Sequence, residues 1–466
     1  MKAMSAALFV LLLVSFAQAQ QSWARTYGGV NSDEGYSVQQ TSDGGYVVMG
    51  YTNSFGAGGY DVYLVKTNAS GDTLWTKVYG GTQDDAGNSV QQTSDGGYII
   101  AGYTQSFGAG DHDVWLLKTN ASGDTLWTRT YGGRLIDEGN SVQQTSDSGY
   151  VIAGHTGSFG AGYDDVYLIK TNAAGDTLWT RTFGGPVYDF GNSVRQTSDG
   201  GYIMTGYTWA MAQSNYDVWL IKTNAAGDTL WTRTYGGMFN DRGNSVRQTL
   251  DGGYVIVGYS NSFADSNDVY LIKTDSSGDT LWTRTYGGYK EEVGNSVQQT
   301  MDGGYIIAGG TWSFGAGADD AWLIKTNVSG DTLWTSTYGG AYADYGYSVQ
   351  QTSDSCYIVA GFTASFGVGL EDVYIIKTDK TGNVGVEEPK SGRQVATGSV
   401  RATPNPFTSF ATIPGHEGER FSVYDISGKM VGAYRGNRIG EGLAPAVYFI
   451  KPEDEHGMSL RVVKVR

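Results

Sequence analysis

The sequence predicts an all-β protein, in which a closed seven-bladed β-propeller is followed by a small immunoglobulin-like β-sandwich. Two observations predict this fold. A unit of about 52 residues recurs along the chain, and each copy contains four short strand-like segments separated by Gly-rich turns. No window shows convincing helical periodicity. With 33 Tyr and 12 Trp the chain is too aromatic to be mostly disordered.

One copy of the unit, from Gly87 to Gly133, shows the expected strands. The first two, Ser89–Thr93 and Tyr98–Tyr103, flank an Asp-Gly turn that is typical of a tight hairpin. The third, Asp113–Lys118, carries the near-continuous apolar run of a strand buried on both faces, and the fourth is Leu126–Tyr131. Four such strands make one propeller blade.

Counting the strands gives the number of blades and the way in which the ring closes. The Ser-Val-x-Gln-Thr strand occurs seven times, and so does the Trp-containing strand. One Trp strand, Ser22–Tyr27, precedes the first full set, and none follows the last third strand, Asp372–Thr378. We therefore expect the N-terminal strand to complete the seventh blade, which removes open sheet edges.

The N-terminus has the pattern of a secretory signal peptide at residues 1–19. Lys2 precedes the apolar run Met4–Phe16, and Ala17-Gln18-Ala19 forms an A-x-A cleavage site. The run is shorter than the roughly 20 apolar residues of a membrane span, so we expect cleavage and no transmembrane anchor afterwards. The propeller then occupies residues 20–385.

A change in composition marks the end of the propeller. Six of the seven prolines follow Val386, and residues 386–402 are typical of a solvated linker. Residues 403–466 contain three strand-like segments, Phe421–Asp425, Ala446–Lys451 and Leu460–Val465, which favour a small β-sandwich.

Four motifs in residues 403–466 resemble the type A C-terminal sorting domain of proteins exported by the bacterial type IX secretion system. They are Pro404-Asn-Pro-Phe407, Val423–Val431, Ala446–Lys451 and Arg461–Arg466. Family members usually carry Gly where this chain has Ala446, which affects one turn. The resemblance implies contact with the secretion machinery through this domain, and a protein that is secreted or held at the outer cell surface of a bacterium. The alternative is an ordinary immunoglobulin-like accessory domain.

The blade unit resembles quinoprotein-type propellers in its Gly-x-x-x-Trp step, as in Gly123–Trp127, and resembles bacterial secreted repeat proteins along its whole length. The adjacent cysteine pair of many quinone-dependent dehydrogenases is missing, because Cys356 is the single cysteine. We therefore expect no quinone and no other cofactor.

The net charge of -16 argues against nucleic-acid binding, which rests on clustered Lys and Arg.

Aspartates recur at three positions of the unit, represented by Asp33, Asp43 and Asp61. Calcium binding is one interpretation, because carboxylates and loop carbonyls suit this cation. Capping of turns and strand ends is the other, and sevenfold recurrence with no D-x-D-x-D-G loop favours it.

Among catalytic signatures, no G-x-S-x-G, H-E-x-x-H or phosphate-binding loop occurs.

Residues that depart from the repeat are the best candidates for function. Alternate loops of an up-and-down sheet share a face, so the invariant turns lie on one face and the variable loops on the other. Arg195 and Arg247 also depart from the repeat, because they replace a Gln that recurs in the other first strands. We predict a binding patch on the variable face, made of Tyr188, Phe190, Trp209, Tyr216, Phe239 and Arg242 and extending to Tyr289 and Trp312. Drift among the repeats, with the rings packed between blades, is the alternative.

The sequence thus favours a secreted, non-catalytic propeller that binds an extracellular glycan or protein. A glycan-active hydrolase or lyase on the same face is the second hypothesis, since paired carboxylates can be recognised only in space. A passive surface-layer or adhesion module is the third.

Overall fold

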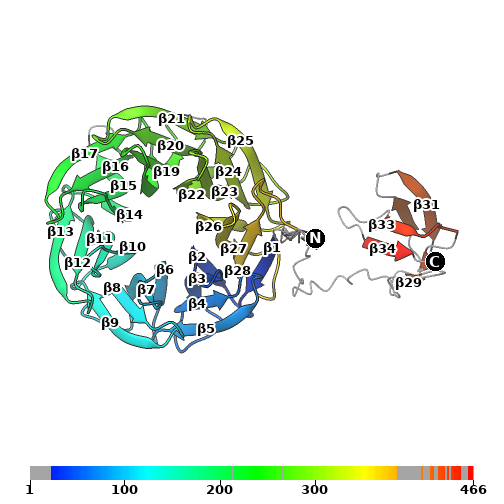
Figure 1. The fold of residues 1–466 in the computed structure, drawn as a ribbon, viewed down its shortest axis with the longest axis horizontal. Helices are drawn as coiled ribbons and strands as arrows, with labels where there is room; N and C mark the ends of the chain where they lie inside the picture. The colour runs from blue at the N-terminus through cyan, green and yellow to red at the C-terminus, as the bar shows by residue number, and fades with distance from the viewer. Residues whose placement is uncertain are drawn as a thin grey trace, which may run out of the picture. The chain divides into compact units, whose positions relative to one another are not determined.

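The computed structural model describes residues 22–211, 214–263 and 266–385, together with short segments between residues 411 and 464. The chain divides into two compact units, residues 1–392 and 393–466. The first unit is a ring of seven four-stranded antiparallel sheets, which confirms the predicted seven-bladed β-propeller (Figure 1). The predicted signal peptide and the linker 386–402 lie outside the described residues.

The first four blades follow one another along the chain. Blade 1 contains β2 (Asp33–Gln40), β3 (Tyr46–Thr52), β4 (Asp61–Thr67) and β5 (Thr73–Tyr79). Blade 2 contains β6 (Asp85–Gln92), β7 (Tyr98–Thr104), β8 (Asp113–Thr119) and β9 (Thr125–Tyr131). Blade 3 contains β10 (Asp137–Gln144), β11 (Tyr150–Thr156), β12 (Asp165–Thr171) and β13 (Thr177–Phe183). Blade 4 contains β14 (Asp189–Gln196), β15 (Tyr202–Ala210), β16 (Asn215–Thr223) and β17 (Thr229–Tyr235).

Blades 5 to 7 complete the ring. Blade 5 contains β18 (Asp241–Gln248), β19 (Tyr254–Ser260), β20 (Asp268–Thr274) and β21 (Thr280–Tyr286). Blade 6 contains β22 (Glu292–Gln299), β23 (Tyr305–Thr311), β24 (Asp320–Thr326) and β25 (Thr332–Tyr338). Blade 7 contains β26 (Asp344–Gln351), β27 (Tyr357–Thr363), β28 (Asp372–Thr378) and, from the other end of the chain, β1 (Trp23–Tyr27).

Strand β1 pairs with β28 in antiparallel register, with Trp23 opposite Lys377 and Tyr27 opposite Val373. Its side chains also contact the next blade. The Trp23 indole donates to the Ala69 carbonyl at 3.2 Å, and the Tyr27 hydroxyl donates to the Gly71 carbonyl at 2.5 Å. The N-terminal strand therefore joins blade 7 to blade 1.

The first strand of each blade begins four residues earlier than expected. In blade 2 the expected start was Ser89, but β6 begins at Asp85, and the register shifts between Gly87 and Ser89. Because this β-bulge interrupts the alternation of inward and outward side chains, the start of the strand cannot be recognised from the sequence pattern. The recurrent acidic residue represented by Asp33 is the first residue of this strand in every blade, and it is buried.

Among the described residues of the propeller, the hydrophobic core consists of seven clusters, each shared by two neighbouring blades. The outermost strand of each blade, which carries the recurrent Trp, covers these interfaces. Trp75 of blade 1 lies over the turn at Gly123 of blade 2, where a Cβ would come within 2.9 Å of the indole ring and where φ is +78°. Glycine is required there for both reasons.

The second unit is described only in its strands. They are β29 (Ala411–Thr412), β30 (Arg420–Tyr424), β31 (Met430–Arg435), β32 (Arg438–Ile439), β33 (Ala446–Pro452) and β34 (Leu460–Lys464). Four of them form one sheet in the order β31-β30-β33-β34, and β29 pairs with β32. The immunoglobulin-like sandwich stays a prediction. Within the described part of the chain, no helix is long and apolar enough to cross a membrane.

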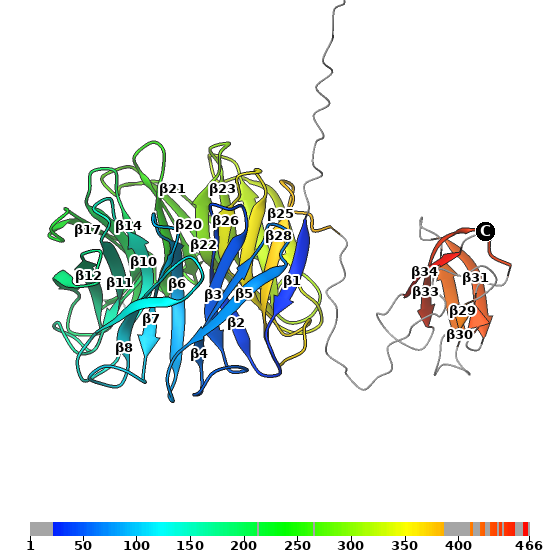
Figure 2. The same cartoon turned by 60° about the horizontal axis from the view of Figure 1, so that its bottom comes forward.

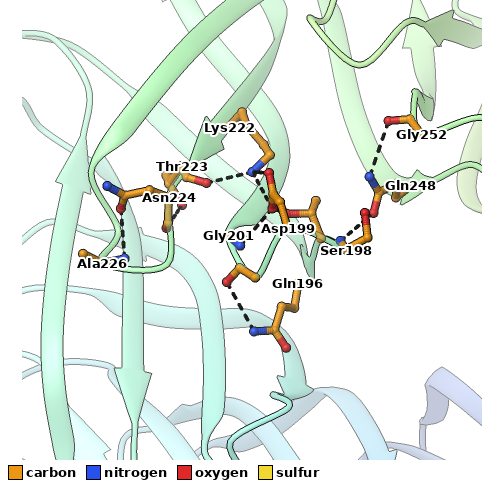
Figure 3. A network of polar contacts seen from close by, with 12 residues as sticks. Gln196, Ser198, Asp199, Gly201, Lys222, Thr223, Asn224, Ala226, Gln248 and Gly252 are labelled. Atoms are coloured by element: carbon orange, nitrogen blue, oxygen red, sulfur yellow. Dashed lines mark hydrogen bonds and ion pairs between the residues drawn. The ribbon is translucent and has the colours of Figure 1, made fainter.

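The propeller has two faces, formed by the connections at the two ends of its strands (Figure 2). We call the face with the turns after the first and third strands the turn face, and the face with the loops after the second and fourth strands the loop face. On the turn face each blade pairs a hairpin aspartate with a buried lysine. In blade 4 the Lys222 ammonium lies 2.9 Å from an Asp199 oxygen and donates to the Thr223 carbonyl (Figure 3).

Candidate binding surface on the loop face

Two columns of residues lie opposite each other on the first two strands of every blade, at their loop-face ends. One column holds the residue that directly follows the buried acidic residue at the start of each first strand. The other column holds the residue of the second strand that pairs with it. The pairs are Glu34–Tyr51, Ala86–Tyr103, Glu138–His155, Phe190–Tyr207, Arg242–Tyr259, Val293–Gly310 and Tyr345–Phe362. No two blades carry the same pair, so one backbone frame presents seven different surfaces.

Five of the eight predicted site residues come together on blades 3 to 5. The Tyr188 ring stacks with Phe190 at 6.5 Å between centroids, and Trp209 meets Tyr216 edge-on at 4.8 Å. The Arg242 guanidinium joins them, because it lies 5.0 Å from the centroid of Tyr216. We call these five residues, with the four partners described next, the aromatic patch.

The four partners were missed by sequence reasoning. Tyr207 links the two halves, since it stacks with Phe190 at 4.8 Å and lies 4.4 Å beneath the Arg242 guanidinium. Tyr163, His155 and Tyr259 extend the patch to blades 3 and 5. Burial raises the pKa of Tyr207 to about 12, against the opposing charge of Arg242, so this hydroxyl stays protonated. Comparing the seven blades column by column would have revealed these positions.

The other three predicted residues lie on separate loops. Phe239 and Trp312 are exposed, and no ring contact joins either to the patch within the described segments. Tyr289 is 77% exposed, and its ring lies 5.6 Å from the Lys290 ammonium. These side chains are available at the surface, but the structure does not gather them with the other five.

A second feature of the loop face was not predicted. A cavity of about 390 Å³ is lined by tyrosines of blades 7, 1 and 2 and by asparagines of blades 2, 3 and 6, and we call it the tyrosine pocket. Five tyrosines line it together with three asparagines and one alanine: Tyr36, Tyr51, Tyr60, Tyr103, Tyr347, Asn88, Asn140, Asn295 and Ala86.

Contacts among the tyrosines fix the wall of the pocket. Tyr36 and Tyr347 meet edge-on at 4.8 Å across the junction of blades 1 and 7, and Tyr51 meets Tyr60 at 4.5 Å. The Tyr51 hydroxyl donates to Glu34 at 2.5 Å. Burial raises the pKa of Glu34, although this hydrogen bond opposes the shift.

A histidine and a carboxylate lie beside the pocket. His112 Nδ1 is 2.7 Å from Glu138, and the imidazole stacks on Tyr103 with centroids 4.5 Å apart. The hydrogen bond that His112 donates to the Glu138 carboxylate raises the pKa of His112, and burial opposes the shift. The Gln105 amide lies 2.6 Å from the other ring nitrogen. This pair could exchange a proton with a ligand.

The recurrent aspartates act as caps. In blade 2, Asp85 accepts the Gly81 amide at 2.7 Å and the hydroxyls of Ser106 and Thr104, while Asp113 accepts the Ala109 amide at 2.7 Å. Within the described residues, no group of three or more His, Cys, Asp or Glu could hold a metal ion. Calcium binding remains the alternative interpretation of these residues.

Comparisons with known proteins give a limited result. No family model matches the chain. The regulatory protein FlaEY of Caulobacter vibrioides is 24% identical over 60% of this chain, and the match spans only 30% of that protein. A puromycin hydrolase structure is 13% identical, with a TM-score of 0.48, over 82% of this chain and 59% of that one. The WD40 domain of Neurospora crassa Pan2 is 10% identical, with a TM-score of 0.46, over 78% and 97%.

The ring itself suggests a binding or scaffold role. A rigid set of sheets holds seven groups of loops around one axis, and loops held in this way commonly carry function.

Proposed function

We propose that this chain is an exported protein whose loop face binds a saccharide without cleaving it. The tyrosine pocket is the observation that carries the proposal. Tyrosine rings offer flat apolar faces for the C–H side of a sugar ring, and their hydroxyls and the asparagine amides can bond to sugar hydroxyls. A cavity lined in this way fits a neutral polar ligand better than an ion or a fatty chain.

The aromatic patch provides a second contact area for a longer chain of sugars. Tyr163 is 66% exposed and Tyr188 is 37% exposed, so their stacked rings are accessible. Both areas lie on the loop face: the tyrosines of the pocket belong to blades 7, 1 and 2, and the aromatic patch belongs to blades 3 to 5. We propose that an extended glycan contacts both, and that a protein partner is the alternative ligand.

The test is a binding screen of the full chain against a panel of polysaccharides. A pocket variant, Tyr60→Ala with Tyr103→Ala, should lower affinity about tenfold or more, equivalent to roughly 1.4 kcal/mol or more. The patch variant Tyr188→Ala with Trp209→Ala should affect long chains more than short ones. Leu281→Ala, at an exposed position on β21, is the control. Unchanged affinity in both variants would exclude the loop face as the site.

Glycan hydrolysis is a second candidate, which the His112–Glu138 contact beside the pocket favours. Release of reducing ends in the same assays, abolished by Glu138→Gln, would establish it. Binding without release would support the non-catalytic function.

Export rests on residues 1–19 and 403–466. We propose that the first segment directs secretion and that the second engages a type IX-like machinery, which would bring the propeller to the cell surface or the medium. The four sorting motifs support this proposal. Normal export of a chain that lacks residues 403–466 would overturn it.

A further inference from the structure

The first strands of the blades surround a channel of about 350 Å³ along the ring axis. Its lining is polar, with Ser and Gln or Asn from every blade, and hydrogen bonds link each first strand to its neighbour. One set is complete around the ring. A serine hydroxyl accepts the valine amide of the next blade in all seven steps, as between Ser37 and Val90.

A second set of bonds is incomplete. In five steps a glutamine side chain accepts a backbone amide of the next blade, as Gln143 does from the Gln196 amide at 2.7 Å. Blades 4 and 5 carry Arg195 and Arg247 in place of this glutamine. A guanidinium has no acceptor. Among the described residues, the corresponding bonds from the Gln248 and Gln299 amides are absent.

The two arginines are the only charged residues that line the channel. Arg195 donates to the Val194 carbonyl at 2.8 Å and lies 3.5 Å from the Ser141 hydroxyl, and Arg247 donates to the Val246 carbonyl at 3.4 Å. Neither forms an ion pair with a residue that the structure describes. Each guanidinium has five N–H donors, so most of them point to no protein acceptor.

The pKa values of the two arginines are consistent with the absence of an anionic partner. Burial, and then the charge of Arg247, hold the pKa of Arg195 well below its usual range, and burial lowers that of Arg247 to about 10. Two like charges on adjacent strands repel each other, and an anion between them would remove that cost. The propeller is otherwise acidic, so these unpaired cations are not part of a general basic surface.

We propose that the channel binds a small oxyanion of the phosphate or sulfate type between Arg195 and Arg247. The planar forks of the two side chains match the oxygens of such an anion, and the two free backbone amides are available as further donors. The site lies toward the turn-face end of the channel, because both arginines are near the ends of β14 and β18 that lead into the turns. The tyrosine pocket shares Tyr36, Asn88, Asn140, Asn295 and Tyr347 with the channel lining and adjoins its loop-face end. Neither arginine lines that pocket, so the proposed anion site does not depend on saccharide binding.

The test measures calorimetric binding of sodium phosphate and sodium sulfate to the full chain, and the melting temperature, at constant ionic strength set with sodium chloride. We expect saturable binding in the millimolar range and a rise in melting temperature. In the double variant Arg195→Gln with Arg247→Gln, affinity should fall more than about tenfold. The variant restores the residue of the other five blades, so it should fold, and without anion it should melt higher than the wild type.

The control is Arg134→Gln, which removes an exposed cation from a loop. It should bind both anions as the wild type does. Binding no stronger than that of chloride, or equal shifts in the double variant and the wild type, would overturn the proposal. Binding of one anion alone would identify which of the two the channel accepts and would still support it.

Discussion

The turn face and the loop face are built by the same strands, yet they differ in what the repeat preserves. On the turn face all seven blades keep the same Asp–Lys pair. On the loop face the paired columns differ in every blade. The backbone bonds of the sheet do not depend on these loop-face side chains, so they were free to diverge while the turn face maintained the ring.

The electrostatics of the two faces differ in the same way. At Asp199 burial opposes ionisation, but hydrogen bonds from Thr197, Lys222 and Gly201 together lower the pKa to about 2. On the loop face, burial and the neighbouring Glu291 and Asp320 raise the pKa of Asp319 to about 6. Asp199 thus has a cationic partner on the turn face, whereas Asp319 has carboxylate neighbours on the loop face.

The largest effect should come from breaking one turn-face pair. Asp199→Ala leaves the Lys222 ammonium, only 4% exposed, without its carboxylate. A fully buried broken pair costs about 3 to 5 kcal/mol, and because Asp199 is half exposed we expect about 2 kcal/mol, measured by urea unfolding. Asp228→Ala removes a solvent-exposed partner of Arg181 on the same face and should be close to neutral. Equal losses in both variants would contradict the role of buried lysine.

A smaller effect should appear on the loop face when pH changes. The raised pKa values of Asp319 and Asp320, both about 6, mean that the folded state binds more protons than the unfolded state between about pH 4 and 6. Stability should therefore fall as pH rises through this window, by on the order of 1 to 2 kcal/mol after allowance for solvent screening.

The measurement is the melting temperature from pH 4 to pH 7 for the wild type and for Asp319→Asn with Asp320→Asn. The double variant should lose less stability over this range. Asp199, whose pKa is lowered, behaves in the opposite sense: its contribution is present above about pH 4 and is lost as pH falls toward 2. The two faces should thus be distinguishable by the pH at which each matters.

Removal of Arg242 should separate stability from binding. The guanidinium contacts the rings of Tyr207, Tyr216 and Tyr259, so Arg242→Ala should cost about 1 kcal/mol in thermal unfolding. If the aromatic patch binds ligand, the loss of affinity for a long glycan should exceed that predicted from stability alone. A variant with unchanged melting temperature would show that the cation–π contacts are not formed in solution.

The smallest effect concerns the hairpins of the turn face. Ser148 replaces the usual glycine and has φ of +65°, where most other blades have glycine at about +82°. Ser148→Gly should relieve this strain and stabilise the protein by about 0.5 kcal/mol, since the entropy cost of glycine offsets part of the gain. Chemical unfolding of this variant beside Ser355→Gly, the same change in blade 7, provides the check.

The ring could be predicted from the sequence because its signals are local and repeated. The Asp-Gly turns and the apolar run of β8 identify strands within one unit, and variation between units identified the loop face. The tyrosine pocket was not predictable in this way. It forms where Tyr36 meets Tyr347, residues far apart in the chain, and only ring closure makes them neighbours. The start of β6 was missed because a bulge interrupts its alternation.

The position of β1 has a consequence for assembly. Trp23 is among the first residues of the propeller to be synthesised, but its partner Lys377 follows about 350 residues later. Until then β1 has no strand beside it, and β28 of any nearby complete copy carries the same pairing residues. Two chains that exchange this strand would each complete the other's seventh blade with native bonds, so domain-swapped dimers are the expected misfolded product at high concentration.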